Sequence, residues 1–463
     1  MQAPGLLTQT SLDSRLTRAR EAEHLGDYDL AVRMLGNYWM GVGRRPGLDD
    51  LDDELGAELL LRAGALTGYL GSAAQSAGAQ EIALDLLTES HTAFTRLGLP
   101  ERVAEVRIEL ATCYNRMGAF DAARAMLDST AELLGEGDPY LRALAAMRRV
   151  ITELSDGKYE AAVEFVAAAA DLVGSCGSDA LRGRYHNEGG ALLFFLSEER
   201  GAGRYAEALA EFVAARHYFG RAGHLRHCAS AENNAALTLV RLGRLRNAHR
   251  YVASARRLAL CVDDRRVLSE LDDTHSQLLA AQERLVEAEE VSRARLDEIA
   301  GTDHGALLAE NLTTHAVLLA QLGRTGDAAE EFDRAVEVAE SAGDLHGAAR
   351  AAALRESELA PDNVVPFRRA ATRGLLSFEW RVADESLRDI GIRRGDAVRF
   401  RVADWGRDGD LVAALAPGGR YVKLAYVEAD GRVRLEGAHP RCPVRRVARS
   451  EISILGVARP HAD

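Results

Sequence analysis

The stretch NAALTLVRLGRLRNAHRYVASARRL, residues 234–258, decides the fold of most of this chain. Apolar residues recur at helical spacing as far as Leu242, and Gly243 then interrupts the pattern. Glycine tolerates positive φ, so it suits the end of a helix. A second apolar series at helical spacing follows the glycine: Ala248, Tyr251, Ala255 and Leu258. The stretch therefore predicts two helices joined by a tight turn, with a small residue where they approach closely.

The same pair of positions recurs along three-quarters of the chain. Glycine stands five residues before alanine in seven places, and Glu283 replaces the glycine in an eighth. Successive alanines are 52, 40, 39, 46, 40, 40 and 40 residues apart. The pairs are Gly26/Ala31, Gly78/Ala83, Gly118/Ala123, Gly157/Ala162, Gly203/Ala208, Gly243/Ala248, Glu283/Ala288 and Gly323/Ala328. Since one helix pair cannot bury its apolar face alone, this period predicts a stacked array of about eight helix pairs over residues 1–358.

Three of the turns also carry tyrosine two positions after the glycine, at residues 26–28, 157–159 and 203–205. With the period of about 40 residues, they resemble the longer variants of the tetratricopeptide repeat family. The resemblance implies an all-α, right-handed solenoid whose concave groove binds a peptide or protein partner. Four polar residues expected on the first helices could hydrogen-bond such a peptide, although solvent-facing or turn-capping roles stay open for them: Asn187, Asn233, Asn234 and Asn311.

Composition and charge narrow the function classes. The five cysteines are scattered without CxxC spacing, which predicts reduced thiols and neither a disulfide framework nor a metal site, and no motif calls for a cofactor. No secretory leader or run of 18 apolar residues occurs, so we expect a soluble cytoplasmic protein with no membrane contact. Before Pro361, Asp and Glu exceed Lys and Arg by 18, whereas from Pro361 onward the basic residues are in excess by 5. Because nucleic acids attract basic surfaces, we do not expect direct DNA binding.

The last hundred residues follow a different pattern. Pro361 and Pro366 break the helical periodicity and indicate a linker over residues 359–377. Beyond it, short segments rich in β-branched residues are bounded by glycine or aspartate: 396–403, 411–415, 420–427, 432–435 and 452–457. They predict a small, mainly β antiparallel domain over residues 378–463, so the fold class is multidomain, an all-α array followed by a β domain.

Lysine usage supplies the sharpest chemical signal. Of the 57 basic residues only Lys158 and Lys423 are lysines. A guanidinium stays protonated in proteins, whereas a buried lysine can lose its proton. Lys423 follows Ser386 by 37 residues. Serine paired with a neutral lysine is a known nucleophile and base, so Ser386 and Lys423 are the candidate catalytic residues.

The sequence around both residues carries a second resemblance. The segments SLRDIGIRRGD (386–396), RDGDLV (407–412) and YVKL (421–424) resemble motifs of the LexA-like, signal-peptidase-related serine peptidases. The resemblance implies that Ser386 is the nucleophile and Lys423 the general base. Burial of Lys423 beside Val422 and Leu424 would favour its neutral amine. The backbone amide of Ser386 could then donate to a developing oxyanion.

The motif also departs from the family. Leu387 stands where methionine is usual, and Glu385 precedes the serine, where a carboxylate close to Lys423 would keep the amine charged. No Ala-Gly or Cys-Gly dipeptide, at which relatives cut themselves, lies within the usual reach of the serine. The nearest, Ala342-Gly343, is 43 residues upstream and is better explained as a helix end.

Two hypotheses therefore stay open. In the first, the protein is a cytoplasmic sensor: its array binds a peptide or protein, and the C-terminal domain cleaves either a partner or its own segment 356–377. In the second, the protein is a non-enzymatic adaptor whose C-terminal domain is a catalytically silent docking module, or one that pairs two copies into a homodimer.

Overall fold

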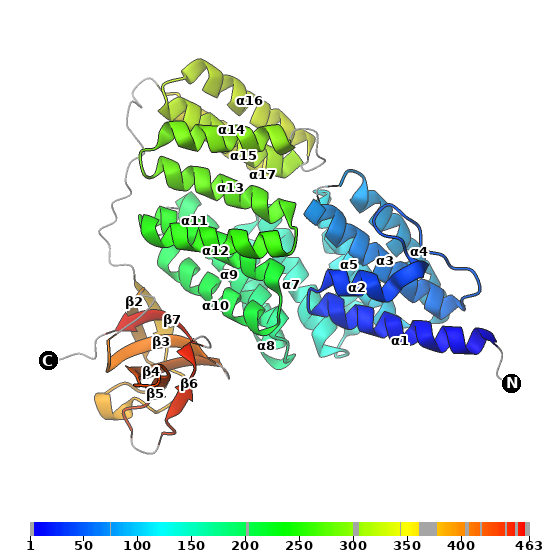
Figure 1. Ribbon diagram of the computed structural model, residues 1–463, viewed down its shortest axis with the longest axis horizontal. Helices are drawn as coiled ribbons and strands as arrows, with labels where there is room; N and C mark the ends of the chain where they lie inside the picture. Colours follow the sequence, from blue (N-terminus) through cyan, green and yellow to red (C-terminus); the bar gives the residue numbers. More distant parts are fainter. Residues whose placement is uncertain are drawn as a thin grey trace.

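The computed structural model describes residues 4–74, 76–200, 203–299, 305–342, 344–360, 377–402, 407–416, 419–439, 442–449 and 452–458. Within them, seventeen α-helices precede seven β-strands. Figure 1 shows the helices as a curved array with the small strand domain beside it. The predicted fold class, a helical repeat array followed by a mainly β domain, is confirmed.

The array consists of consecutive helices of similar length. They are α1 (Pro4–His24), α2 (Tyr28–Leu35), α3 (Asp53–Ala74), α4 (Ala79–Leu97), α5 (Pro100–Arg116), α6 (Phe120–Leu134), α7 (Pro139–Ser155), α8 (Tyr159–Ser175), α9 (Asp179–Arg200), α10 (Tyr205–Arg221), α11 (Leu225–Arg241), α12 (Leu245–Cys261), α13 (Arg265–Ala280), α14 (Leu285–Ile299), α15 (Gly305–Gln321), α16 (Thr325–Ser341) and α17 (Leu345–Glu358). A short 3-10 helix, η1 (Gly36–Tyr38), follows α2.

Each predicted turn has the same backbone conformation. The seven repeat glycines have positive φ, and so does Glu283, at 64°. The alanine five residues later is fully buried, with 0% exposure, in all eight cases. A side chain in the left-handed region costs about 1–2 kcal/mol, which is why glycine occupies seven of the eight turns. Each repeat of the sequence therefore corresponds to one structural unit, in which a left-handed turn is followed by a close contact between two helices.

The odd-numbered helices form the inner side of the curve, because contacts between neighbouring helix pairs run mainly through them. The array curves far enough for α13 to touch α3. Near the same place, the turn at Gly26 meets His224, at the start of α11. A Cβ at position 26 would lie 2.1 Å from the imidazole, so the close approach requires glycine.

The strand domain is one antiparallel sheet with the order β1-β2-β7-β3-β4-β5-β6. Its strands are β1 (Ser377–Arg381), β2 (Ala397–Val402), β3 (Asp410–Ala416), β4 (Gly419–Val427), β5 (Val433–Glu436), β6 (Arg445–Val447) and β7 (Ser453–Ala458). The five expected strands correspond to β2, β3, β4, β5 and β7. The expected segments omit β1 and β6, the two edge strands of the sheet, which have only five and three residues.

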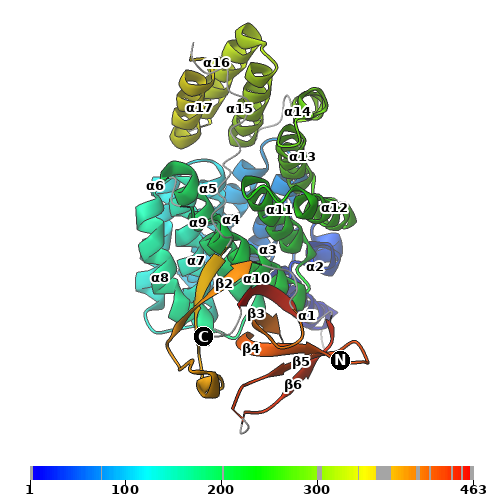
Figure 2. The same cartoon turned by 90° about the vertical axis from the view of Figure 1, so that its left-hand side faces the viewer.

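Both faces of the sheet are covered. One face contributes Phe400, Leu411 and Val422 to an apolar cluster that also contains Phe212 of α10. Helix α10 lies against β1 and β7, as Figure 2 shows. The other face holds a separate apolar cluster that includes Val412, Ala425, Leu435 and Ile454. The array and the strand domain therefore share a core. Among the described residues, no helix has both the length and the apolar character needed to span a membrane.

Candidate active site

Ser386 lies between β1 and a 3-10 helix, η2 (Arg388–Ile390), and is only 2% exposed. Its carbonyl oxygen accepts a hydrogen bond from the backbone N–H of His439, at 3.0 Å. A Cβ at Gly437 would lie 2.6 Å from that oxygen and 2.8 Å from the Ser386 Cβ, so a larger residue would displace the serine. The connection after β5 thus holds the serine segment in place. Sequence reasoning missed Gly437, because only the folded chain brings this glycine to Ser386.

Strand β4 carries Lys423 to the serine. Its Nζ donates a hydrogen bond to Ser386 Oγ, and its side chain is 12% exposed. The structure therefore brings together the two residues that the sequence selects as nucleophile and base. The expected surroundings of the amine differ, however. Side chains alternate along a strand, so Val422 and Leu424 point to the array-facing side and do not surround the Nζ atom.

A third residue, Asp384, completes the cluster. Its carboxylate accepts from Lys423 Nζ at 2.8 Å and 3.1 Å, and its Oδ1 also accepts from the backbone N–H of Ser386 at 2.9 Å. Partial burial raises the pKa of Asp384, but hydrogen bonds from Lys423 and Ser386 outweigh it and hold that pKa below the usual value. The carboxylate is therefore ionised at neutral pH.

Lys423 thus contacts a serine and a carboxylate at once. The carboxylate of Asp384 holds the amine in an ion pair, whereas a general base needs a lone pair free to accept the serine proton. The Ser386 amide, which we expect to donate to an oxyanion, is already bonded to the same carboxylate. The charge that the sequence suggested at Glu385 comes instead from Asp384, one position earlier, while Glu385 is exposed. An aspartate that accepts from the N–H two residues later is a common turn, so Asp-x-Ser was the available signal.

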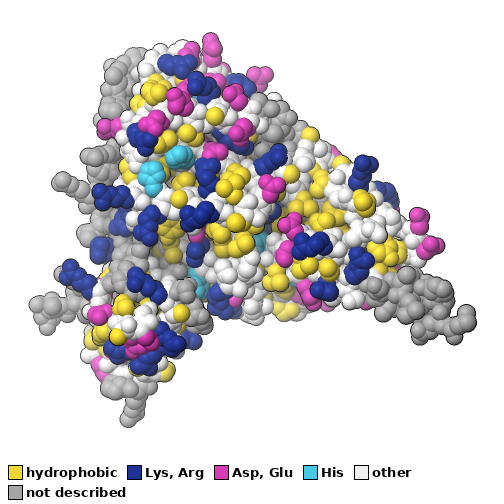
Figure 3. Space-filling model, in the orientation of Figure 1, with side chains coloured by type: hydrophobic (Ala, Val, Ile, Leu, Met, Phe, Trp, Pro, Cys, Tyr) yellow, Lys and Arg dark blue, Asp and Glu magenta, His cyan; other side chains and the backbone are white. Residues whose placement is uncertain are grey.

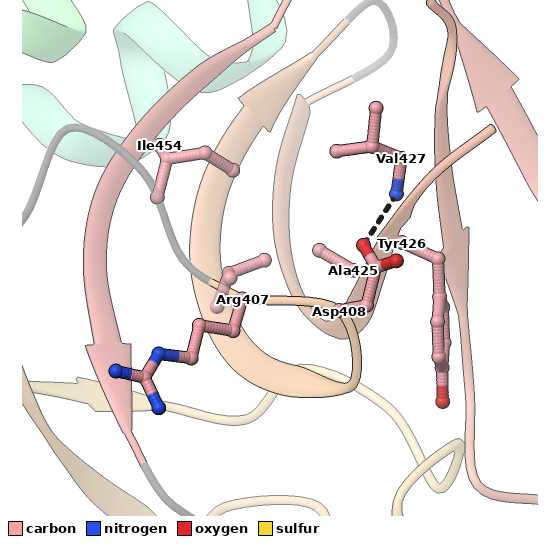
Figure 4. A pocket seen from close by; sticks show the side chains of 7 residues that line it. Arg407, Asp408, Ala425, Tyr426, Val427 and Ile454 are labelled. Carbon is pink, nitrogen blue, oxygen red and sulfur yellow. Dashed lines mark hydrogen bonds between the residues drawn. The ribbon is translucent and has the colours of Figure 1, made fainter. Parts of the chain in front are cut away.

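A shallow pocket lies on the Lys423 side of the sheet, because Val412, which lines it, is the register partner of Lys423. Figure 4 shows Asp408 accepting from the backbone N–H of Val427, at 2.8 Å, at the edge of this pocket. Neither Ser386 nor Lys423 lines it. The full lining is Arg407, Asp408, Val412, Ala425, Tyr426, Val427 and Ile454.

The asparagines expected in the groove are placed differently from one another. Asn234 of α11 donates to Asn187 of α9 at 3.2 Å, so two inner helices present a joined polar pair. Asn233 is buried, and its Oδ1 has no hydrogen-bond partner among the residues that the structure describes. Asn311 of α15 is buried and donates to the Leu307 carbonyl of its own helix, at 2.8 Å. The structure thus brings Asn187 and Asn234 together and keeps Asn311 apart.

The segment expected as a cleavage site lies largely outside the described residues, since these omit 361–376. The dipeptide at 342–343 falls at a helix end, because α16 ends at Ser341 and Ala342 caps it; residue 343 is itself outside the described part of the chain.

Comparisons with known proteins address the two parts separately. Residues 345–459 match the family described as Peptidase S24-like. A solved structure of a Rap protein complexed with competence and sporulation factor is 12% identical with a TM-score of 0.55, and the alignment covers 73% of this chain and 99% of that one. Aspartyl phosphate phosphatase F from Bacillus subtilis is 14% identical with a TM-score of 0.49, over 74% of this chain and 96% of that one. No curated protein matches the sequence.

The Rap likeness concerns fold alone, because the sequence identity is low. The family match covers α17 and the strand domain, including Ser386 and Lys423. The chain therefore joins a tetratricopeptide-like helical array, similar in fold to a Rap protein, to a C-terminal segment that matches the Peptidase S24-like family.

Proposed function

We propose that this protein is a regulatory sensor whose array binds a peptide or protein and whose C-terminal domain cleaves a peptide bond, either in the chain itself or in a partner. The observation that carries the proposal is the direct contact between Lys423 Nζ and Ser386 Oγ. The match of residues 345–459 to a peptidase-like family supports the chemistry. A protein of similar fold that forms a complex with competence and sporulation factor supports the role of the array.

The chemistry follows from the two groups. Neutral Lys423 takes the hydroxyl proton while Ser386 Oγ attacks the carbonyl carbon of the scissile bond. The C–N bond breaks as the lysine returns the proton to the leaving amine, and water then hydrolyses the acyl-serine ester. The Ser386 amide stabilises the oxyanion once Asp384 has withdrawn from it. Withdrawal of Asp384 is therefore the step that activates the dyad.

The contacts of the strand domain suggest how the array controls that step. Val382 and Leu387 bracket the segment that contains Asp384 and Ser386, and both belong to the apolar cluster shared with α10. A partner that changes the curvature of the array would move α10 against this cluster. The serine segment would then shift relative to Lys423 on β4. Segment 356–377, which joins the two parts, remains the proposed site of self-cleavage.

The adaptor hypothesis has one observation in its favour, which is the double engagement of Asp384 with Lys423 and the Ser386 amide. In that case the strand domain docks a partner or pairs two copies of the chain, and the dyad is silent. The two functions make different predictions for Ser386→Ala, which would abolish the activity of a peptidase and leave an adaptor intact.

The deciding experiment is intact-mass measurement of the purified protein after incubation between pH 7 and pH 10. We expect two fragments whose masses sum to that of the parent plus one water and that form faster at alkaline pH, because the general base must be an uncharged amine. Ser386→Ala and Lys423→Met should stay whole under the same conditions. If the parent gives no fragments at any pH, or if Ser386→Ala gives the same ones, self-processing of the isolated protein is refuted, and only cleavage of a partner or the adaptor function remains.

A further inference from the structure

Five side chains from inner helices and the first turn meet inside the curve of the array, and we call them the arginine hub: Tyr28, Tyr69, Arg116, Arg148 and Arg184. The rings of Tyr28 and Tyr69 are stacked, with centroids 5.1 Å apart. The guanidinium of Arg116 lies 4.6 Å from the Tyr69 ring centroid, and Arg148 donates to the Tyr69 hydroxyl. The hub gathers residues from α2, α3, α5, α7 and α9, which are far apart in the sequence.

The three arginines of the hub have no ion pair with any carboxylate in the described part of the chain. Arg62, a more deeply buried arginine of the array, contacts three carboxylates, those of Glu23, Glu58 and Glu105. Two carboxylates near the hub act on its arginines without forming such an ion pair among the described residues. Glu109 accepts from the Tyr69 hydroxyl at 3.5 Å and acts on Arg148 through space, and Glu188 acts on Arg184 in the same way. A buried guanidinium without a counter-charge is costly.

The clustering of arginines at the hub differs from the charge distribution of the rest of the array. The array is acidic overall, and on the face shown in Figure 3 basic and acidic side chains are interspersed over the helices. Burial, and then the neighbouring Arg148, lower the pKa of Arg184. Burial likewise opposes the charge of Arg148, but Tyr69 and Glu109 outweigh it and raise the pKa of that arginine. The hub therefore concentrates positive charge inside an acidic array.

Several hydrogen-bond donors at the hub also lack acceptors. Arg148 is 8% exposed, and in the described part of the chain neither its Nε nor Nη1 of Arg116 has a hydrogen-bond partner. Arg184 donates to Nε2 of His227 at 3.1 Å, so the proton of that ring is on Nδ1, which is likewise unpartnered. An unmet buried donor costs about 1–3 kcal/mol. The same site thus combines excess positive charge with free donors.

We infer that the arginine hub binds an oxyanion, a carboxylate or a phosphate, carried by the partner of the array. The inference rests on the partner-binding role proposed above and specifies its chemistry. Guanidinium groups present paired donors that match the two oxygens of a carboxylate or phosphate. Binding would offset part of the positive charge of the three arginines and provide acceptors for the free N–H groups of Arg116 and Arg148. Because the hub links five helices, it would also draw them toward one another.

The test is thermal unfolding of full-length protein carrying Ser386→Ala, titrated with inorganic phosphate and, separately, with succinate at constant ionic strength. We expect a saturable rise in Tm with at least one probe, and the comparison of probes separates a phosphate from a carboxylate preference. Arg148→Met and Arg184→Gln should each weaken the apparent affinity at least about tenfold, since each removes charge-assisted hydrogen bonds. Arg257→Gln, at an exposed position of α12, should respond as the parent does.

Two results would overturn the inference. One is a rise in Tm of equal size in the parent, the hub variants and Arg257→Gln, which is a general salt effect. The other is no rise with either probe. If Arg148→Met does not fold, Arg184→Gln decides alone. Every protein in this titration carries Ser386→Ala, so an unchanged Tm would not count against the peptidase proposal. Conversely, absence of fragments in the cleavage assay would not count against anion binding at the arginine hub.

Discussion

Replacement of Asp384 should release the dyad, and the two contacts of its carboxylate can be removed separately. Asp384→Asn removes the negative charge but keeps an oxygen that can accept from the Ser386 amide. Asp384→Ala removes both. We therefore expect the rate of fragment formation to rise in the order parent, Asp384→Asn, Asp384→Ala. The difference in rate between the two variants measures the effect of freeing the Ser386 amide.

The size of each step follows from the geometry. The Asp384 side chain is 56% exposed, so its ion pair with Lys423 is screened and contributes about 1 kcal/mol. Loss of that ion pair corresponds to about a fivefold rise in rate. A free oxyanion donor adds as much as about 10²-fold to 10³-fold in rate. Because the pKa of Asp384 is lowered, the carboxylate is ionised throughout pH 7–10, so the rate advantage of the variants should be present across that range.

The assay is a time course of intact mass at fixed pH, with Glu385→Gln as the matched control. Glu385 is the adjacent exposed carboxylate and has no contact with Lys423 among the described residues. It should leave the rate unchanged. If Asp384→Ala cleaves no faster than the parent, or if Glu385→Gln accelerates cleavage equally, Asp384 does not restrain the dyad.

Three other perturbations test separate parts of the structure. Gly437→Ala should abolish fragment formation without changing the Tm of the array, because its Cβ would lie 2.6 Å from the Ser386 carbonyl oxygen; normal cleavage would disprove that support role. Glu283→Gly should stabilise the protein by about 1 kcal/mol in denaturant unfolding, since it relieves a left-handed backbone, whereas Glu290→Gly within α14 should destabilise it by about 1 kcal/mol; equal effects would contradict the turn assignment. Burial lowers the pKa of His224 to about 3, so its contribution to stability is complete above pH 6.5 and falls by about 1.4 kcal/mol per pH unit below it. In unfolding measured from pH 7 to pH 5, His224→Asn should lose less stability than the parent, and parallel curves would rule this out.

Much of the fold follows from the pattern of residues alone. The glycine and alanine five residues apart predicted every repeat, and Glu283 adopts the same backbone as the glycines it replaces. Short apolar segments located five of the seven strands. Such features are predictable because burial and turn conformation repeat at a fixed chain spacing. The two edge strands escaped prediction because they are short: β1 alternates apolar and polar residues over only five positions, and β6 has only three residues.

The candidate site divides in the same way. The rarity of lysine and the family motif selected Lys423 and Ser386, and the structure places them in contact. Asp384 escaped prediction because its direction depends on the path of one loop. Gly437 escaped because its contact with Ser386 spans 51 residues of chain.

By itself, the sequence determined the repeat array, the β domain and the pair of residues proposed for catalysis, since each depends on local spacing or composition. The tertiary structure alone decided that Asp384 contacts both Lys423 and the Ser386 amide, that α10 shares a core with the sheet, and that Arg116, Arg148 and Arg184 converge without an ion pair among the described residues. The physical reason is that a short stretch of chain records which face is buried. Which distant side chains meet depends instead on the curvature summed over many helices and on the exact paths of the loops.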